Sequence, residues 1–297
     1  MLDYEIKPID ISDLLVRNQI AELASIAFKT KYSQDKILLN TDTSSSVAPT
    51  LYLGAFHGKD LIGFTWFMSH DLLYNAKIVN CYQVVWAMVH PKQEGKMIFP
   101  CLVNKAKKLL HERGAGFIFA YPSANTYQIM VKLLRFRPEP IVNVNVPAIR
   151  LIAGNYFSPW NEDKSFLFKD AYLQNDEQLI KLKKREYGDE IKVVDQDCQN
   201  LIWGRIKTRK IGPLNLRYFS VGGLIINDPI RMPDLFYKLI KQQRILLARF
   251  LFNRSSRYAR LFRKVETAAS SFIVFDLNTT TSSKKAYNYM HGIRATI

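Results

Sequence analysis

The sequence predicts an α/β fold, a mixed twisted sheet flanked by helices, and two observations carry this prediction. First, apolar runs of strand length alternate with stretches of helical periodicity. Second, the 297 residues are 48% hydrophobic and 12% aromatic, which is a globular composition at a length suited to two domains. No apolar run approaches the roughly 20 residues of a membrane-spanning helix, so we expect no transmembrane segment.

The elements of the first half follow from these patterns and their turn residues. A polar segment at residues 29–49 has no periodicity and predicts a surface loop that borders a site. His57 lies in the turn of a hairpin, and Gly114 ends a helix. In chain order we expect strands at residues 4–8, 50–56, 61–70, 78–89, 117–121 and 141–152, and helices at 11–27, 97–113 and 124–134.

A boundary near residues 150–165 predicts two domains, 1–152 and 165–297. In the second domain a helix is expected at 176–187, a strand leading into a polar turn at 189–200, strands at 201–211 and 214–227, a helix from 232 and a strand at 271–278. The strand–helix–strand order resembles that of the first half. An internal repeat with a degenerate second copy would explain this similarity.

Charge is concentrated at the C-terminal end of the chain. Residues 1–200 hold 24 basic and 22 acidic side chains, whereas residues 201–297 hold 18 and 4, a net charge of +14. Within this part, residues 241–264 read as a basic amphipathic helical region. It would contact an anionic partner, such as a phosphate-bearing substrate, an anionic membrane surface or nucleic acid. The alternative is a solvated face whose apolar stripe packs on the core.

Cysteine and histidine usage excludes two further classes. Cys81, Cys101 and Cys198 are widely spaced and odd in number, and the five histidines have no metal-ligand spacing, so we expect neither a disulfide scaffold nor a metal site. The acidic first residues do not resemble a signal peptide, which predicts a cytoplasmic protein.

One segment resembles a known family. Val89-His90-Pro91-Lys92-Gln93-Glu94-Gly95-Lys96, followed by a helix, a strand, Asn125 and Leu134-Arg135-Phe136-Arg137-Pro138, is similar to the core of the GNAT acyltransferase superfamily. The resemblance covers residues 2–150. It implies a second GNAT-like domain in tandem and a loop whose amides hold the pyrophosphate of acetyl-CoA or another acyl-CoA. The cofactor-binding residues that it implies are Met88, Val89, Gly95, Lys96, Met97, Ile98, Phe99 and Asn125.

The chemical anchors of the family are replaced in this chain. Glu94 stands for the arginine of the loop, and Met97 and Phe99 stand for its later glycines. Gln83 occupies the position of a glutamate base, and Val131 that of a tyrosine acid. Tyr127 and Tyr82 are the substitutes as the acid, although each is also explained as a packed aromatic side chain. The predicted catalytic residues are therefore Tyr127, Tyr82 and Gln83.

The resemblance implies an N-acyltransferase that moves an acetyl or other acyl group from acyl-CoA to an amine. Arg205 and Arg217 on strands of the second half would suit an anionic acceptor, such as an amino sugar nucleotide. Two alternatives stay open. One is a Fem-like transferase that uses aminoacyl-tRNA, favoured by the altered loop and the basic C-terminal part, and the other is a non-catalytic GNAT-fold binding protein.

Overall fold

The computed structural model describes residues 3–41, 48–74, 77–152, 171–174, 176–196, 200–228, 230–253, 266–277 and 286–288. It divides into two compact units, each built from three separate segments of the chain. Unit 1 comprises Met1–Asp71, Val79–Pro138 and Phe272–Ser282, and unit 2 comprises Leu72–Ile78, Glu139–Ser271 and Ser283–Ile297. The division into domains 1–152 and 165–297 stays a prediction.

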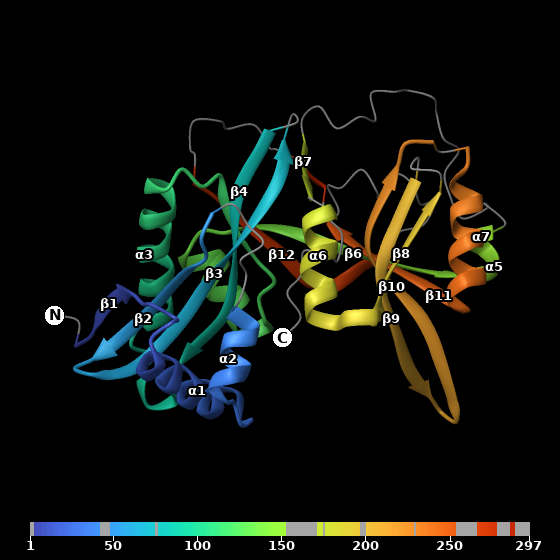
Figure 1. Cartoon of the computed structure of the whole chain (residues 1–297). Coiled ribbons are helices and arrows are strands. Elements are labelled where there is room, and N and C mark those ends of the chain that lie inside the picture. Colours follow the sequence, from blue (N-terminus) through green and yellow to red (C-terminus); the bar gives the residue numbers. More distant parts are fainter. Residues whose placement is uncertain are drawn as a thin grey trace. The chain divides into compact units, whose positions relative to one another are not determined.

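Unit 1 is a mixed sheet with helices on both faces (Figure 1). Its strands follow the order β1-β2-β3-β4-β5-β12. They are β1 (Glu5–Pro8), β2 (Leu51–His57), β3 (Asp60–Tyr74), β4 (Lys77–Val89), β5 (Phe117–Ala120) and β12 (Glu266–Asp276). Residues 72–74 of β3, 77–78 of β4 and 266–271 of β12 belong to unit 2. The helices are α1 (Leu14–Phe28), α2 (Gln34–Thr41), α3 (Ile98–Glu112) and α4 (Ala124–Gln128), which a π-helical turn at Ile129–Leu133 continues.

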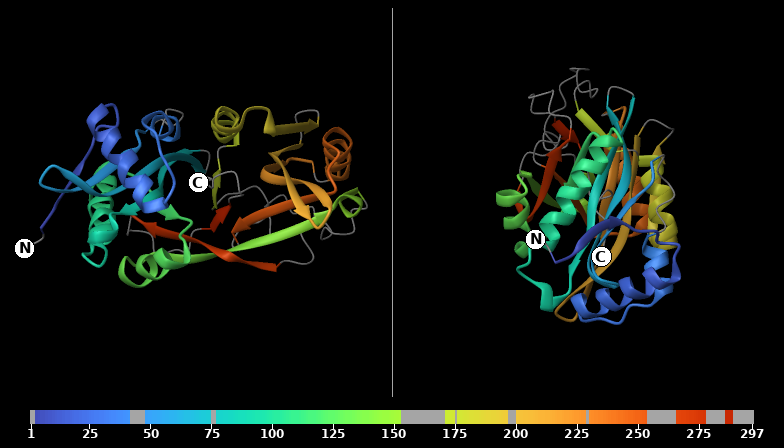
Figure 2. Two further views of the ribbon diagram at one scale, coloured as in Figure 1. Left: turned by 90° about the horizontal axis from the view of Figure 1, so that it is seen from below. Right: turned by 90° about the vertical axis from the view of Figure 1, so that its left-hand side faces the viewer.

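Local signals in the sequence fix the ends of these helices. The Asp13 carboxylate accepts a bond from the Leu15 N–H at 2.8 Å and caps α1, which ends where Lys29 turns left-handed. Gly114, at φ 74°, donates its N–H to the His111 carbonyl after α3. In the left-hand view of Figure 2, α1 and α2 lie on one side of the strands and α3 on the other.

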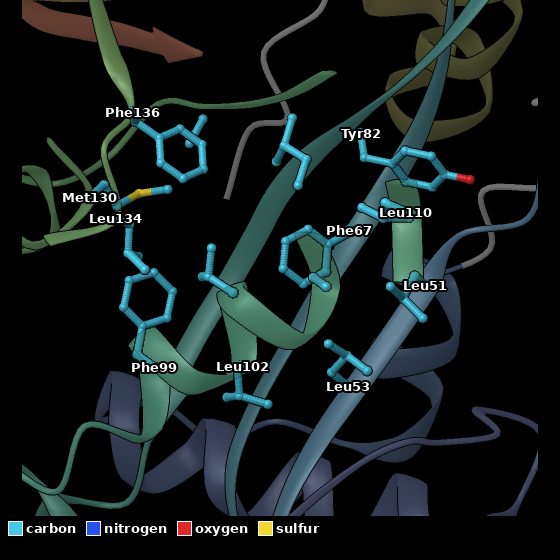
Figure 3. Packing of buried hydrophobic residues seen from close by; sticks show 14 of the residues in the cluster. Leu51, Leu53, Phe67, Tyr82, Phe99, Leu102, Leu110, Met130, Leu134 and Phe136 are labelled. Atoms are coloured by element: carbon cyan, nitrogen blue, oxygen red, sulfur yellow. The ribbon is translucent and has the colours of Figure 1, made fainter. Parts of the chain in front are cut away.

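The core of unit 1 packs α3 against the sheet (Figure 3). Leu102, Ala106 and Leu110 recur at helical spacing on α3 and are fully buried. Gly63 on β3 allows α3 to approach closely, because a Cβ at this position would lie 2.5 Å from Ile98 Cγ2. Ile98 is the first residue of α3, so this contact positions the start of the helix.

The strands of unit 2 follow the order β6-β11-β10-β9-β8. Its strands are β6 (Arg137–Pro147), whose first two residues belong to unit 1, β8 (Ile191–Gln196), β9 (Asn200–Ile211), β10 (Leu214–Ile226) and β11 (Leu247–Asn253). The helices are α5 (Ala148–Ile152), α6 (Asp176–Tyr187) and α7 (Met232–Gln243), and two short strands, β7 (Ala171–Gln174) and β13 (Ala286–Asn288), pair with each other. Leu235, Phe236 and Leu239 of α7 pack on the core of the sheet.

Both units contain the same topological step. In unit 1, β4 and β5 run parallel on either side of α3 in the chain, and β12 pairs antiparallel with β5. In unit 2, β10 and β11 run parallel on either side of α7, and β6 pairs antiparallel with β11. The last strand of each unit thus comes from the other half of the chain. The interpretation of unit 2 as a degenerate copy stays a prediction.

Most expected elements occur within a few residues of their predicted bounds, but four expectations were wrong. Segment 29–49 contains α2, and strand 141–152 ends at Pro147 and continues as α5. The strand expected at 271–278 occurs as the end of β12, but it is not the first strand after the helix: that strand is β11, and β12 pairs with β5. The helical structure expected at 241–264 was also wrong over residues 247–253. The helix α7 ends at Gln243, and alternate residues Ala248, Phe250 and Phe252 are buried, which is the period of strand β11. The basic residues from 254 to 264 lie outside the described residues.

Candidate functional site

The loop between β4 and α3 is the centre of the candidate site. The His90 N–H donates to the Ile62 carbonyl at 2.9 Å and ties the end of β4 to β3. A 3₁₀ turn at Pro91–Gln93 follows, and the Glu94 N–H donates to the Pro91 carbonyl at 3.2 Å. Gly95 has φ 82° and Met97 has φ 60°. Two left-handed residues in three positions turn the chain sharply into α3.

The start of α3 is suited to an anion. The side chains of Ile98 and Phe99 are buried, whereas Glu94, Gly95 and Lys96 are exposed. The backbone N–H groups of the first helical turn have no carbonyl one turn earlier to bond, and the helix dipole adds a partial positive charge there. Pro100 has no N–H, so the amides of Met97, Ile98 and Phe99 supply the donors. A Cβ placed on Gly95 would meet no atom within 4 Å, so the loop is open on that side.

Tyr4 holds this loop in place. Its hydroxyl donates to the Lys96 carbonyl at 3.1 Å, across 92 positions of the sequence. Burial raises the pKa of Tyr4 to about 12, and a hydrogen bond with Cys101 acts in the same direction. Tyr4 is therefore a neutral donor over the physiological pH range. Tyr4, which directly precedes strand β1, thus contributes to the conformation of a loop near residue 95.

The strands β4 and β5 diverge beside the loop. They pair only from Cys81 to Gln83, opposite Phe117 to Phe119. Trp86 then has φ 49°, a conformation that is rare for a bulky side chain and costs on the order of 1–3 kcal/mol. The Thr65 hydroxyl donates to the Val85 carbonyl at 3.1 Å, next to this irregularity. The backbone of β4 beyond Gln83 is consequently released from β5.

Gln83 has a titratable neighbour on β3. Nε2 of His70 lies 3.2 Å from Oε1 of Gln83, and both side chains are buried, with exposed fractions of 4% and 3%. The imidazole ring also lies against the ring of Phe119 on β5, with centroids 5.5 Å apart. His70 and Gln83 therefore face each other next to the point where β4 leaves β5.

Residues 6–130 match a family model described as an acetyltransferase (GNAT) domain. The chain contains a GNAT acetyltransferase domain. The match begins within β1, ends within the π-helical turn and includes the loop at Gly95, whereas Tyr4 and β12 lie outside it. The class of activity is that of the N-acyltransferases.

Solved structures share the fold over both units. A GCN5-related N-acetyltransferase from Anabaena variabilis has a TM-score of 0.63 at 8% identity, covering 93% of this chain and 73% of that one. One from Kribbella flavida has a TM-score of 0.58 at 10% identity, covering 92% and 72%. A GCN5-related glucosamine N-acetyltransferase region of a fungal multi-domain β-N-acetylglucosaminidase has a TM-score of 0.51 at 13% identity, covering 92% and 38%. No curated protein sequence gives a significant match.

The GNAT domain gathers most of the predicted cofactor residues at one end of β4. Gly95, Lys96 and Met97 are exposed in the loop, and Val89 is half-buried at the end of the strand. The side chain of Met88 is only 1% exposed, so its contribution would be limited to the backbone. Asn125 is exposed in the first turn of α4. The donors, the open glycine and the exposed loop fit a pyrophosphate group.

The two tyrosines predicted as the acid, Tyr82 and Tyr127, differ in their burial. Tyr82 is 1% exposed and packs in the core of unit 1, where its hydroxyl donates to the Pro49 carbonyl at 3.2 Å (Figure 3). Burial raises the pKa of Tyr82, so it is a weak acid held in a structural bond. Tyr127 is half-buried at the edge of the same core, beside Val131. Tyr127 is the more accessible of the two tyrosines.

The two predicted acceptor arginines lie in unit 2. Arg205 Nε donates to the Glu190 carboxylate at 2.5 Å, and its guanidinium lies 3.9 Å from the centroid of the Tyr187 ring. Its charge is therefore already balanced within unit 2. Arg217 is exposed on β10, and its carbonyl accepts a bond from the Leu246 N–H at 3.1 Å. Their role toward an acceptor stays a prediction.

Sequence reasoning missed an aromatic cluster and His70. The rings of Trp66 and Trp86 stack with centroids 4.9 Å apart, and Tyr32 and Phe28 lie edge-on to Trp86 at 5.1 and 5.8 Å. The indole N–H of Trp66 is buried without a hydrogen-bond partner among the described residues. His70 had no sequence signal, because the predicted strand ended at residue 70 and the next began at 78, which left the pairing of these strands undefined.

The described residues contain neither a metal-ligand cluster nor a membrane-spanning helix. Within the described ranges, no group of three or more histidine, cysteine or acidic side chains could hold a metal ion. Among the helices that the structure describes, none is long and apolar enough to cross a membrane. Cys81 and Cys101 are free thiols, and burial raises the pKa of Cys81 well above its usual range. Cys198 lies outside the described residues.

Proposed function

We propose that the protein transfers an acetyl or other acyl group from acyl-CoA to the amino group of a small anionic molecule, such as an amino sugar nucleotide. The observation that carries the proposal is the loop at Gly95. Its left-handed backbone, its open side and the amides at the start of α3 together suit a pyrophosphate. When bound, the donor supplies an activated thioester.

The altered loop residues are compatible with this donor. Glu94 is exposed, so water stabilises its charge and the carboxylate need not approach the pyrophosphate. Lys92 and Lys96, which are also exposed, make the local charge net positive. Met97 adopts φ 60°, which a glycine would adopt with less strain. The loop thus has a left-handed conformation at Gly95 and Met97, which at Met97 has a conformational cost.

The chain has a group that can accept the proton of the attacking amine. Gln83 cannot take a proton at neutral pH. His70 lies 3.2 Å from Gln83 and is the titratable side chain of that pair. The Gln83 amide can orient the imidazole, which would accept the proton directly or through water as the nitrogen bonds to the acyl carbon and the thiolate leaves. Tyr127, the accessible tyrosine, would return a proton to the thiolate.

The donor is tested by calorimetric titration of the full chain with acetyl-CoA and longer acyl-CoAs. Gly95→Trp should abolish micromolar binding because its side chain fills the open side of the loop. Gly58→Trp is the matched control, since Gly58 also has positive φ and open space but lies in the β2–β3 turn. Equal loss of binding in both variants, or no binding by the wild type, would contradict the proposal.

The acceptor is tested with pairs of amines that differ only by a phosphate. Glucosamine is a suitable parent compound, because the fungal neighbour is described as a glucosamine N-acetyltransferase. Release of free thiol should be faster with the phosphorylated or nucleotide-linked member of each pair, and Arg217→Gln should reduce that preference. If no acyl-CoA binds, a salt-dependent shift assay with aminoacyl-tRNA tests the Fem-like alternative. Binding without turnover of any amine would favour a non-catalytic role.

A further inference from the structure

The hairpin of β9 and β10 extends beyond the rest of its sheet. Strand β8 pairs with β9 only as far as Arg205, and β11 pairs with β10 only from Tyr218 onward. Residues 206–217 therefore form a two-stranded arm that pairs with no further strand among the described residues (Figure 1). At roughly 3.3 Å per residue, the arm reaches about 20 Å from the sheet.

The arm carries charge of one sign. Lys207, Arg209, Lys210 and Arg217 lie on it, and the sequence from residue 200 to 227 contains no acidic residue. Register places Lys210 and Arg217 on one face and Lys207 and Arg209 on the other, so both faces are basic. A cluster of like charges on a narrow ribbon is stabilised by an anionic surface.

The tip of the arm is apolar and exposed. Ile211 and Leu214 are paired across the turn and have exposed fractions of 55% and 71%. Gly212 and Pro213 form the turn between them. Leu216 follows on the same face as Ile211 and Leu214. Exposed aliphatic side chains at the end of an isolated ribbon stabilise nothing within unit 2.

From these features we infer that the arm binds an anionic phospholipid surface. The basic side chains would contact the headgroups, and Ile211 and Leu214 would insert at the boundary between headgroups and acyl chains. Nucleic acid fits the arm less well, because residues 206–217 include no aromatic ring for base stacking. A second copy of the chain is disfavoured, because two such arms would bring eight positive charges together.

The inference is tested by co-sedimentation of the full chain with phosphatidylcholine vesicles, with and without 30 mol% phosphatidylglycerol. We expect binding only to the anionic vesicles, with a decrease as salt rises. Each basic residue near the surface contributes about a fivefold factor, so Arg209→Gln with Lys210→Gln should weaken binding roughly 25-fold. The matched control, Lys184→Gln with Lys241→Gln, removes the same charge from exposed positions of α6 and α7 and should bind nearly as the wild type does.

A second variant separates the apolar tip from the charges. Ile211→Ser with Leu214→Ser should weaken binding to the same vesicles and leave its salt dependence unchanged, with a melting temperature equal to that of the wild type because neither residue lies in a core. Equal binding to neutral and anionic vesicles would overturn the inference. So would an unchanged affinity in the arm variants, tighter arm-dependent binding to single-stranded RNA, or an arm-dependent dimer in solution. None of these results depends on acyl-CoA binding.

Discussion

Replacing Gly63 with alanine tests whether packing on β3 positions the start of α3. The added Cβ would lie 2.5 Å from Ile98 Cγ2, 3.4 Å from Ala55 Cβ and 3.5 Å from Leu102 Cδ1. Carbon atoms pack at about 3.5–4.0 Å, so only the contact with Ile98 is too short, by about 1 Å. Relieving it must displace the first turn of α3, and overpacking of this kind costs about 1–3 kcal/mol.

The change is measured by urea unfolding followed by tryptophan fluorescence and by the affinity for acetyl-CoA. We expect Gly63→Ala to lose about 1–3 kcal/mol and to bind acetyl-CoA more weakly, because the first-turn amides of α3 move. Ile98→Leu has no Cγ2 methyl group and should restore most of both losses in the double variant. Its own cost should stay below about 1.5 kcal/mol.

A double-mutant cycle decides the outcome. If the clash with Ile98 is the cause, the coupling between positions 63 and 98 should be at least about 1 kcal/mol in favour of the double variant. Gly58→Ala is the control: it introduces strain at φ 60° but contacts nothing, so Ile98→Leu should not rescue it. A cost below about 0.5 kcal/mol for Gly63→Ala, or additive effects in the cycle, would refute the reasoning.

Three further predictions concern single side chains. Tyr4→Phe removes the bond to the Lys96 carbonyl and should cost about 1 kcal/mol in unfolding and several-fold in acetyl-CoA affinity, whereas unchanged affinity would show that the loop holds its shape alone. His70→Gln should lower kcat at least roughly 100-fold and remove the acidic limb of the pH–rate profile, and a profile identical to that of the wild type would exclude His70 as the proton acceptor. Burial, together with the charge of Arg135, lowers the pKa of Lys107 from 10.5 to about 8. Between pH 8 and 10.5 the Lys107 amine is therefore mostly neutral in the folded protein but protonated in the unfolded chain. The free energy of unfolding should consequently rise with pH over this range. Lys107→Met should remove this rise, which is checked by urea unfolding of both proteins at pH 7 and pH 10. An equal change in unfolding free energy in the two proteins would show that burial does not destabilise the ammonium.

The elements that the sequence predicted well have short-range causes. The helix α6 runs from Asp176 to Tyr187, as its period indicated, and the β2–β3 hairpin turns at Gly58. The helix α3 ends at Glu112, just before the left-handed Gly114. Patterns of this kind depend only on neighbours in the chain, and so a single sequence contains them.

The errors arose where a distant partner decided the local structure. Residues 247–253 have apolar side chains at both helical and strand spacings, and pairing with β6 and β10 selects the strand. The segment 271–276 appeared to follow the helix of the second half, yet it pairs with β5. A sequence pattern states that a strand exists but does not state which strand lies beside it.

In the candidate site, too, some features follow from the sequence alone and others depend on distant partners. The sequence by itself determined the α/β class and the loop with Gly95, because motifs are contiguous and each residue type has fixed chemistry. That Gln83 and Val131 replace a base and an acid stays a prediction from the family resemblance. Only the tertiary structure decided that His70 faces Gln83, that Tyr4 anchors the loop and that Arg205 is paired with Glu190. These relations join residues that are 13, 92 and 15 positions apart, and such contacts exist only once the sheets have formed.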